Sequence, residues 1–177
     1  VTVGVGGSLR LATSEEIGTL AGAGAVLLQG NTLTLGGSAA TTYSGVMSGA
    51  GTLVKNGAAV FTATAANTFA GGVRLSAGAF EAGDNAAFGT GLVAFSGGRI
   101  SSDSGTARTI ANAFTVTGAV GLGDALNSGE LTFTPAAHGS GSETLLVSIC
   151  DAQGACSTST VFIEVTPVND APIVDNI

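Results

Sequence analysis

Short runs of β-forming residues recur along this sequence at intervals of roughly twenty residues, and each run ends near glycine, asparagine or serine. The runs occupy residues 8–11, 26–28, 32–35, 51–54, 72–75, 92–95, 114–116 and 131–133. Inside them, pairs such as Leu33/Leu35 and Val73/Leu75 alternate with other residues, which is typical of half-buried strands. Glycine interrupts every window in which a helical period could develop, at a cost of about 1 kcal/mol per occurrence. We therefore predict an all-β chain with almost no helix.

The composition indicates how these runs stack. Hydrophobic residues make up 45% of the 177 residues, aromatic residues only 5%, and 29 residues are glycine. Small aliphatic side chains suit the thin, laddered interior of a parallel β-solenoid, and glycine supplies the positive φ that tight corners need. The sequence predicts such a solenoid over residues 1–134, followed by a short antiparallel segment over 135–177. A β-sandwich also has short strands and glycine-rich turns, so it stays open as the alternative for the first region.

Charge and hydropathy exclude two classes of partner. The net charge is −7, and the five basic residues are one lysine and four arginines. Phosphate binding needs clustered basic residues, so we expect neither nucleic acid nor an anionic membrane surface as a partner. The longest apolar stretch, near residues 20–28, is broken by Gly22 and Gly24 and is too short to span a bilayer, so we expect no membrane insertion. No basic, apolar leader opens the sequence, and we expect a mature protein or an excised fragment.

Two cysteines, Cys150 and Cys156, flank a five-residue stretch that contains a glycine. Cysteines this close can face each other across a hairpin, and we predict a disulfide between them, with two free thiols as the alternative. A zinc site is not expected, because His138 is the only histidine.

Candidate catalytic residues are sparse. Asp84, Asp103 and Asp124 lie about twenty residues apart and would stack in a solenoid, as the carboxylates of polysaccharide-acting solenoids do. Aspartates at such spacing are more often corner residues, however, and His138 has no evident nucleophile as a partner. We therefore expect a protein that is not an enzyme.

A set of motifs in the first region is similar to autotransporter passenger-associated β-strand repeats. They are, in the order of that family, residues 16–24, 31–37, 42–49, 51–57, 66–72, 76–80 and 85–91. The resemblance implies a right-handed parallel β-helix that serves as a rigid spacer on the cell surface, with no catalytic residues to carry over.

The C-terminal region, 135–177, resembles the last strands of bacterial cadherin-like or immunoglobulin-like adhesin repeats. The strand at 161–165 alternates cleanly, and Pro167 and Pro172 stiffen the exit. The first strands of such a domain are missing, so a neighbouring element must complete the sheet.

That second resemblance also implies a calcium site. The Asn169-Asp170 pair matches the family's ligand pattern, while Asp151 and Asp175 are further candidate ligands. Gln153 stands where the family commonly has a second acid, which lowers the expected affinity. The alternative is that Asn169-Asp170 is simply a turn before Pro172.

Together these features predict a structural module of a secreted or cell-surface bacterial adhesin, acting as a rigid spacer in the extracellular space. Its expected partners are adjacent modules or identical subunits, joined through β-edge pairing. Two alternatives stay open: a complete subunit of an extracellular filament joined by strand exchange, and a carbohydrate-binding or carbohydrate-degrading solenoid.

Overall fold

The structure is a computed structural model that describes residues 1–104, 106, 108–123, 131–132, 141–150 and 156–165, the last three segments as backbone. Every regular element among these residues is a β-strand, which confirms the all-β prediction. None of the described residues forms a helix of the length and apolarity needed to cross a bilayer.

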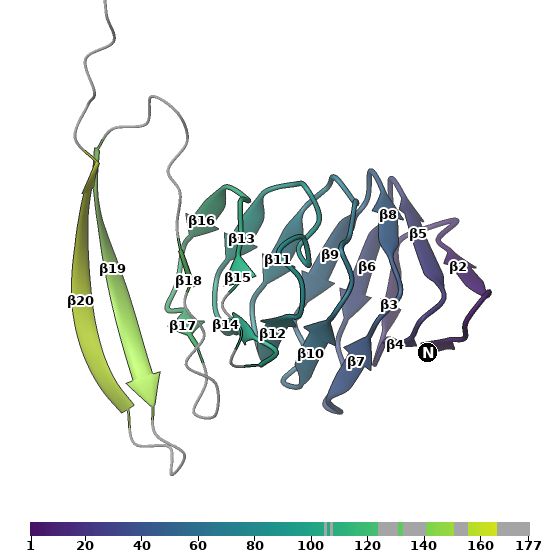
Figure 1. The fold of residues 1–177 in the computed structure, drawn as a ribbon, viewed down its shortest axis with the longest axis horizontal. Coiled ribbons are helices and arrows are strands. Elements are labelled where there is room, and N and C mark those ends of the chain that lie inside the picture. The colour runs from purple at the N-terminus through teal and green to yellow at the C-terminus, as the bar shows by residue number, and fades with distance from the viewer. Residues whose placement is uncertain (105, 107, 124–130, 133–140, 151–155, 166–177) are drawn as a thin grey trace, which may run out of the picture.

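Most of the described chain coils into a parallel β-solenoid of about six turns (Figure 1). One sheet has the order β1-β4-β7-β10-β12-β14-β17, and a second has the order β3-β6-β9-β11-β13-β16. A third, shorter sheet is formed by β2, β5 and β8. The chain passes from one sheet to the next at each corner, so that the solenoid predicted for the first region is confirmed.

The strands of the stack are short. The seven of the first sheet are β1 (Thr2–Val3), β4 (Ala21–Gly22), β7 (Thr41–Tyr43), β10 (Val60–Ala63), β12 (Ala79–Ala82), β14 (Arg99–Ser102) and β17 (Gly121–Leu122). The six of the second are β3 (Glu15–Ile17), β6 (Thr32–Leu35), β9 (Thr52–Lys55), β11 (Val73–Leu75), β13 (Val93–Phe95) and β16 (Phe114–Val116). The three of the third are β2 (Ser8–Arg10), β5 (Ala25–Gln29) and β8 (Met47–Gly49).

Two further pairs of strands follow or flank this stack. The strands β15 (Arg108–Thr109) and β18 (Leu131–Thr132) pair in parallel. The strands β19 (Gly141–Cys150) and β20 (Cys156–Val165) form an antiparallel hairpin, which confirms the antiparallel segment. The hairpin follows the last rung of the stack and contacts β17 (Figure 1).

The register explains the twenty-residue period. Leu33 pairs with Leu53, Leu53 with Val73, and Val73 with Val93, so that residues twenty positions apart lie directly above one another. All four side chains are at most 1% exposed. Because strands alternate with period two, the residues between them, such as Val54, face outward. The inward-facing residues therefore form ladders, and each turn of the solenoid contributes one residue to each ladder.

The interior is bulkier than the composition predicts. Small aliphatic side chains were expected to fill it, but the six largest fully buried side chains are aromatic: Tyr43, Phe61, Phe69, Phe80, Phe88 and Phe95. The Phe61 and Phe80 rings meet edge to face with centroids 5.3 Å apart, and Phe80 lies 4.6 Å from Phe88. Six of the nine aromatic residues are thus buried inside the solenoid, which the overall percentage conceals.

Corners bring backbones of successive turns too close for a side chain. Gly22 has φ +103°, and a Cβ atom there would collide with the Val3 backbone of the preceding turn. Only glycine adopts this conformation without strain and leaves the space open.

Asn67 ties three successive turns together at a corner that has no regular strand. Its side chain is 2% exposed. The Oδ1 atom accepts a hydrogen bond from the Met47 backbone N–H at 2.8 Å, and Nδ2 donates to the Ala87 carbonyl at 2.7 Å. The side chain thus adds two bonds between turns to the backbone hydrogen bonds on this face, such as Thr68 N–H to the Met47 carbonyl at 2.9 Å.

We predict that Asn67→Ala lowers the free energy of unfolding by roughly 3 kcal/mol, because it leaves a buried N–H and a buried carbonyl without partners. The matched control is Asn112→Ala, since Asn112 is only partly buried and donates to Gly89 and Gly91. Its loss should cost about 1 kcal/mol. Urea denaturation of both variants measures the difference, and equal costs would contradict the role given to Asn67.

Two buried titratable groups make stability depend on pH in opposite directions. Burial lowers the pKa of Lys55, whereas burial raises the pKa of Tyr43 to about 12. Below its ordinary pKa, Lys55 binds a proton more tightly in the unfolded chain, so stability rises with pH until the unfolded lysine also titrates. Above pH ~10 the unfolded tyrosine ionises while the folded one does not, so stability falls.

We therefore predict that stability rises toward pH ~10 and falls between about pH 10 and 12. The denaturation midpoint measured from pH 7 to 12 tests this profile. Lys55→Met should remove the rise and Tyr43→Phe the fall; the assignment is clean because the chain has one lysine and one tyrosine. A midpoint that stays flat from pH 8 to 10 would show that Lys55 does not carry the rise.

Candidate functional site

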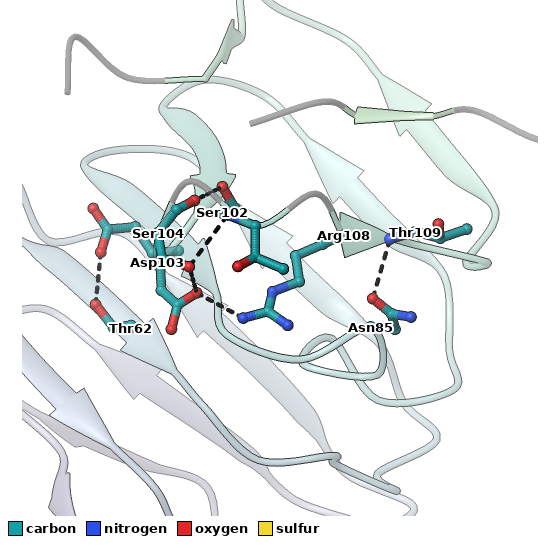
Figure 2. A network of polar contacts seen from close by, with 9 residues as sticks. Thr62, Asn85, Ser102, Asp103, Ser104, Arg108 and Thr109 are labelled. Carbon is teal, nitrogen blue, oxygen red and sulfur yellow. Dashed lines mark hydrogen bonds and ion pairs between the residues drawn. The ribbon is translucent and has the colours of Figure 1, made fainter. Parts of the chain in front are cut away.

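A network of polar contacts lies where β10, β12 and β14 run side by side and the chain leaves β14 (Figure 2). Register places Glu81 between Thr62 and Ser101 on the outer face, and the Thr62 hydroxyl donates to Glu81 Oε2 at 2.8 Å. Asp103 directly follows β14, and its Oδ1 atom lies 3.0 Å from Nη2 of Arg108, the first residue of β15. We call these residues, with Ser102 and Ser104, the Asp103 cluster.

Hydrogen bonds within the Asp103 cluster hold the loop in place. The Ser104 hydroxyl donates to Asp103 Oδ1 at 3.3 Å, and the Ser102 hydroxyl donates to the Ser104 carbonyl at 2.5 Å. Nearby, the Thr109 backbone N–H donates to Asn85 Oδ1 at 3.1 Å, which joins the loop to the preceding turn (Figure 2). Asp103 Oδ1 and Arg108 Nη2 are thus engaged with each other, and Asp103 Oδ1 also accepts from Ser104.

The electrostatics of the cluster are those of a structural loop. The Arg108 and Asp103 side chains are 23% and 22% exposed, so water screens their ion pair, which stabilises by at most about 1 kcal/mol. Arg99 Nε, Ser101 Oγ and Arg108 Nε are buried without a hydrogen-bond partner among the described residues. These atoms are covered by protein, so an incoming ligand would not contact them unless the loop moved.

The three predicted aspartates do not form a described stack. Asp84 Oδ1 accepts from the Ala86 backbone N–H at 2.8 Å and thereby fixes a corner, while Asp103 pairs with Arg108. Asp124 lies outside the described residues. Within the described part of the chain, no three histidine, cysteine, aspartate or glutamate side chains are grouped so that they could hold a metal ion.

The other predicted site residues belong to the C-terminal part of the sequence. The ligand candidates Asp151, Asn169, Asp170 and Asp175 lie outside the described residues. Cys150 ends β19 and Cys156 begins β20, and register pairs these two residues directly across the hairpin. The backbone thus meets the first requirement of the predicted disulfide.

Sequence reasoning missed two buried polar residues. Asn67 stands between apolar runs like an ordinary turn residue, and only its burial shows its bridging role. Lys55 did carry a signal, because Leu35 and Leu75, each twenty residues away, show that position 55 faces inward. A charged residue among apolar ones in such a ladder is costly to bury, so its position in the sequence predicts a specific polar partner.

Residues 93–164 match the family model of a bacterial Ig domain. The match agrees with the immunoglobulin-like resemblance, but it begins at Val93, inside the parallel stack, rather than near residue 135. It spans β13 to β19 and nearly all of β20. The resemblance of residues 1–134 to autotransporter repeats is not confirmed by this comparison. No curated protein and no solved structure matches the chain.

Proposed function

We propose that this protein is a structural module of a secreted or cell-surface bacterial adhesin, and that it acts as a rigid β-rich spacer rather than an enzyme. The observation that carries the proposal is the continuous parallel stack in which residues such as Leu33, Leu53, Val73 and Val93 form one unbroken buried ladder. The match to a bacterial Ig domain supports a modular structural protein.

Stiffness follows from the way each turn is held. Backbone hydrogen bonds join successive turns even at corners, for example from Gly71 N–H to the Gly51 carbonyl at 3.0 Å. Neighbouring strands lie ~4.8 Å apart, so the seven strands of the first sheet extend the stack by roughly 30 Å. Bending such a stack requires stretching many hydrogen bonds along one face together.

We also propose β-edge pairing as the means by which the spacer joins neighbouring modules; in the filament alternative the same edges would join identical subunits. Among the described strands, β1, β2 and β3 each pair on one side only, with β4, β5 and β6. The hairpin strands β19 and β20 pair only with each other in backbone hydrogen bonding. Unpaired edges are the groups that another strand recognises.

Charge is distributed in a way that supports calcium binding near the hairpin. Residues 1–123 contain five acidic and five basic residues and have no net charge. The remaining seven acidic residues lie in 124–177, which has no lysine or arginine: Asp124, Glu130, Glu143, Asp151, Glu164, Asp170 and Asp175. We propose that calcium, which prefers such hard oxygen ligands, binds through Asp151, Asn169, Asp170 and Asp175.

The spacer proposal predicts a monomer whose stack exchanges slowly and uniformly. Strands β4 to β14 of the first sheet are paired on both sides, so their amides should exchange far more slowly than corner amides, with or without calcium. Hydrogen exchange and sedimentation velocity in EDTA and in calcium chloride measure both properties. Calcium should protect amides near residues 151 and 169–175 and leave the stack unchanged.

Two outcomes would replace this proposal. Concentration-dependent oligomers that resist mild denaturant would favour a filament subunit joined by strand exchange. Saturable binding on a glycan array, or release of reducing sugar, would favour a carbohydrate-binding or carbohydrate-degrading solenoid. The spacer proposal expects neither.

We predict that Cys150 and Cys156 form a disulfide in the secreted protein. Alkylation followed by mass spectrometry should find no free thiol until a reductant is added. In a chain-entropy estimate, closing so short a loop stabilises the hairpin by about 2 kcal/mol. The Cys150→Ser/Cys156→Ser variant should therefore exchange its β19 and β20 amides faster while the stack keeps its protection. Two alkylated cysteines without reductant would exclude the disulfide.

A further inference from the structure

One inner ladder of the solenoid contains a charge. Leu35 pairs with Lys55, Lys55 with Leu75, and Leu75 with Phe95 along the second sheet. Lys55, the only lysine of the chain, is 2% exposed. Burying an ammonium group is costly unless oxygen atoms surround it, so this residue needs a specific local structure.

The corner after β9 supplies the first oxygen. Lys55 Nζ donates a hydrogen bond to the Gly57 carbonyl. Gly57 uses its own N–H for the preceding turn, donating to the Leu35 carbonyl at 3.0 Å. The ammonium therefore satisfies a carbonyl at the corner where the chain turns from the second sheet to the first.

The next turn leaves room for this arrangement at one residue. Gly78 has φ +70°, and a Cβ atom there would collide with the Gly57 carbonyl and lie 2.6 Å from Lys55 Nζ. The flanking residues are Ala77 and Ala79, which both carry a Cβ atom. Shifting this corner by one residue in either direction would place a methyl group against the ammonium.

The following turn provides a natural comparison. Gly98 occupies the equivalent corner with φ +81°, and a Cβ atom there would lie 3.1 Å from Leu75 Cγ and 2.9 Å from the Gly78 carbonyl. Gly98 thus shares the backbone conformation of Gly78 but has a hydrocarbon side chain beneath it. The two corners differ in what a Cβ atom would meet: the ammonium and the backbone carbonyls of Gly57 and Ala59 at Gly78, but a leucine side chain and a more distant carbonyl at Gly98.

A cavity of about 10 Å³ lies beside Lys55, lined also by Gly37, Ala39, Thr41 and Phe61 among others. This volume has room for one water molecule, which would give the ammonium a second acceptor. No other titratable residue lines the cavity. Among the described residues, the ammonium of Lys55 is therefore held by the Gly57 carbonyl and forms no ion pair with a carboxylate.

Aliphatic ladders alone specify register weakly along this stack. A strand that slips by two residues keeps its apolar residues facing inward, so Leu53 in place of Lys55 would still be buried against Leu35. A single buried polar residue that finds its partner in one alignment only removes this ambiguity, as in coiled coils. We propose that Lys55, Gly57 and Gly78 form a polar lock that fixes the register of the turn containing β9 against the turns on either side.

The variants Lys55→Met, Gly78→Ala and Gly98→Ala, with the two double variants that contain Lys55→Met, test the lock. Lys55→Met should fold with an equal or higher melting temperature, because an apolar side chain avoids the desolvation cost. Its amide spectrum should show a second set of resonances for β6, β9 and β11, the sign of an alternative register.

Gly78→Ala should lower the melting temperature by roughly 5–10 °C, and by less when Lys55→Met is also present, because the contact with the ammonium is then gone while those with the carbonyls of Gly57 and Ala59 remain. Gly98→Ala should lower it equally in both backgrounds. If Gly78→Ala alone does not fold, folding of the double variant supports the lock. A single set of resonances in Lys55→Met, or equal losses from Gly78→Ala in both backgrounds, would overturn it.

Discussion

The whole structure depends on parallel pairing between turns that are about twenty residues apart. Each turn is too thin to bury its own apolar side chains, and it does so only when the turns above and below cover it. The same contact satisfies the backbone, as the bonds between corner glycines show. Burial and hydrogen bonding therefore impose one common requirement, which is that every residue lie above its equivalent in the previous turn.

Much of this arrangement could be predicted from the sequence, because the requirement acts on every turn. Leu33 and Leu35 face inward for the same reason as Val73 and Leu75, and the repeated spacing reveals it. A contact that occurs at only one turn leaves no repeated spacing in the sequence. The Phe61–Phe80 contact depends on how wide the interior is at one turn, which spacing does not report. The ligand residues inferred from the cadherin-like resemblance have no repeated equivalents that could test them.

The boundary between the solenoid and the C-terminal region is clearer in the distribution of charge than in the structure. The strands β13, β14, β16 and β17 belong to the parallel stack, where Val93 and Phe95 continue the inner ladders, yet the bacterial Ig match begins at Val93. The charge changes later, since all of the net charge of −7 lies beyond residue 123. A neutral stack minimises repulsion between its closely spaced turns, whereas an acidic segment has to find cations or remain in contact with water.

Regularity makes the solenoid stiff, and it also makes alternative alignments similar in energy. Leucine over leucine is equally favourable at many offsets, so apolar burial supplies stability but little uniqueness. The buried polar groups instead favour one alignment of the turns. Asn67 bonds to Met47 N–H and the Ala87 carbonyl, and Tyr43 donates to the Gly24 carbonyl at 2.6 Å. Each bond exists in one alignment only. A stack with a purely apolar interior could therefore be more stable and yet less suited to hold a fixed length, which is the property that a spacer needs.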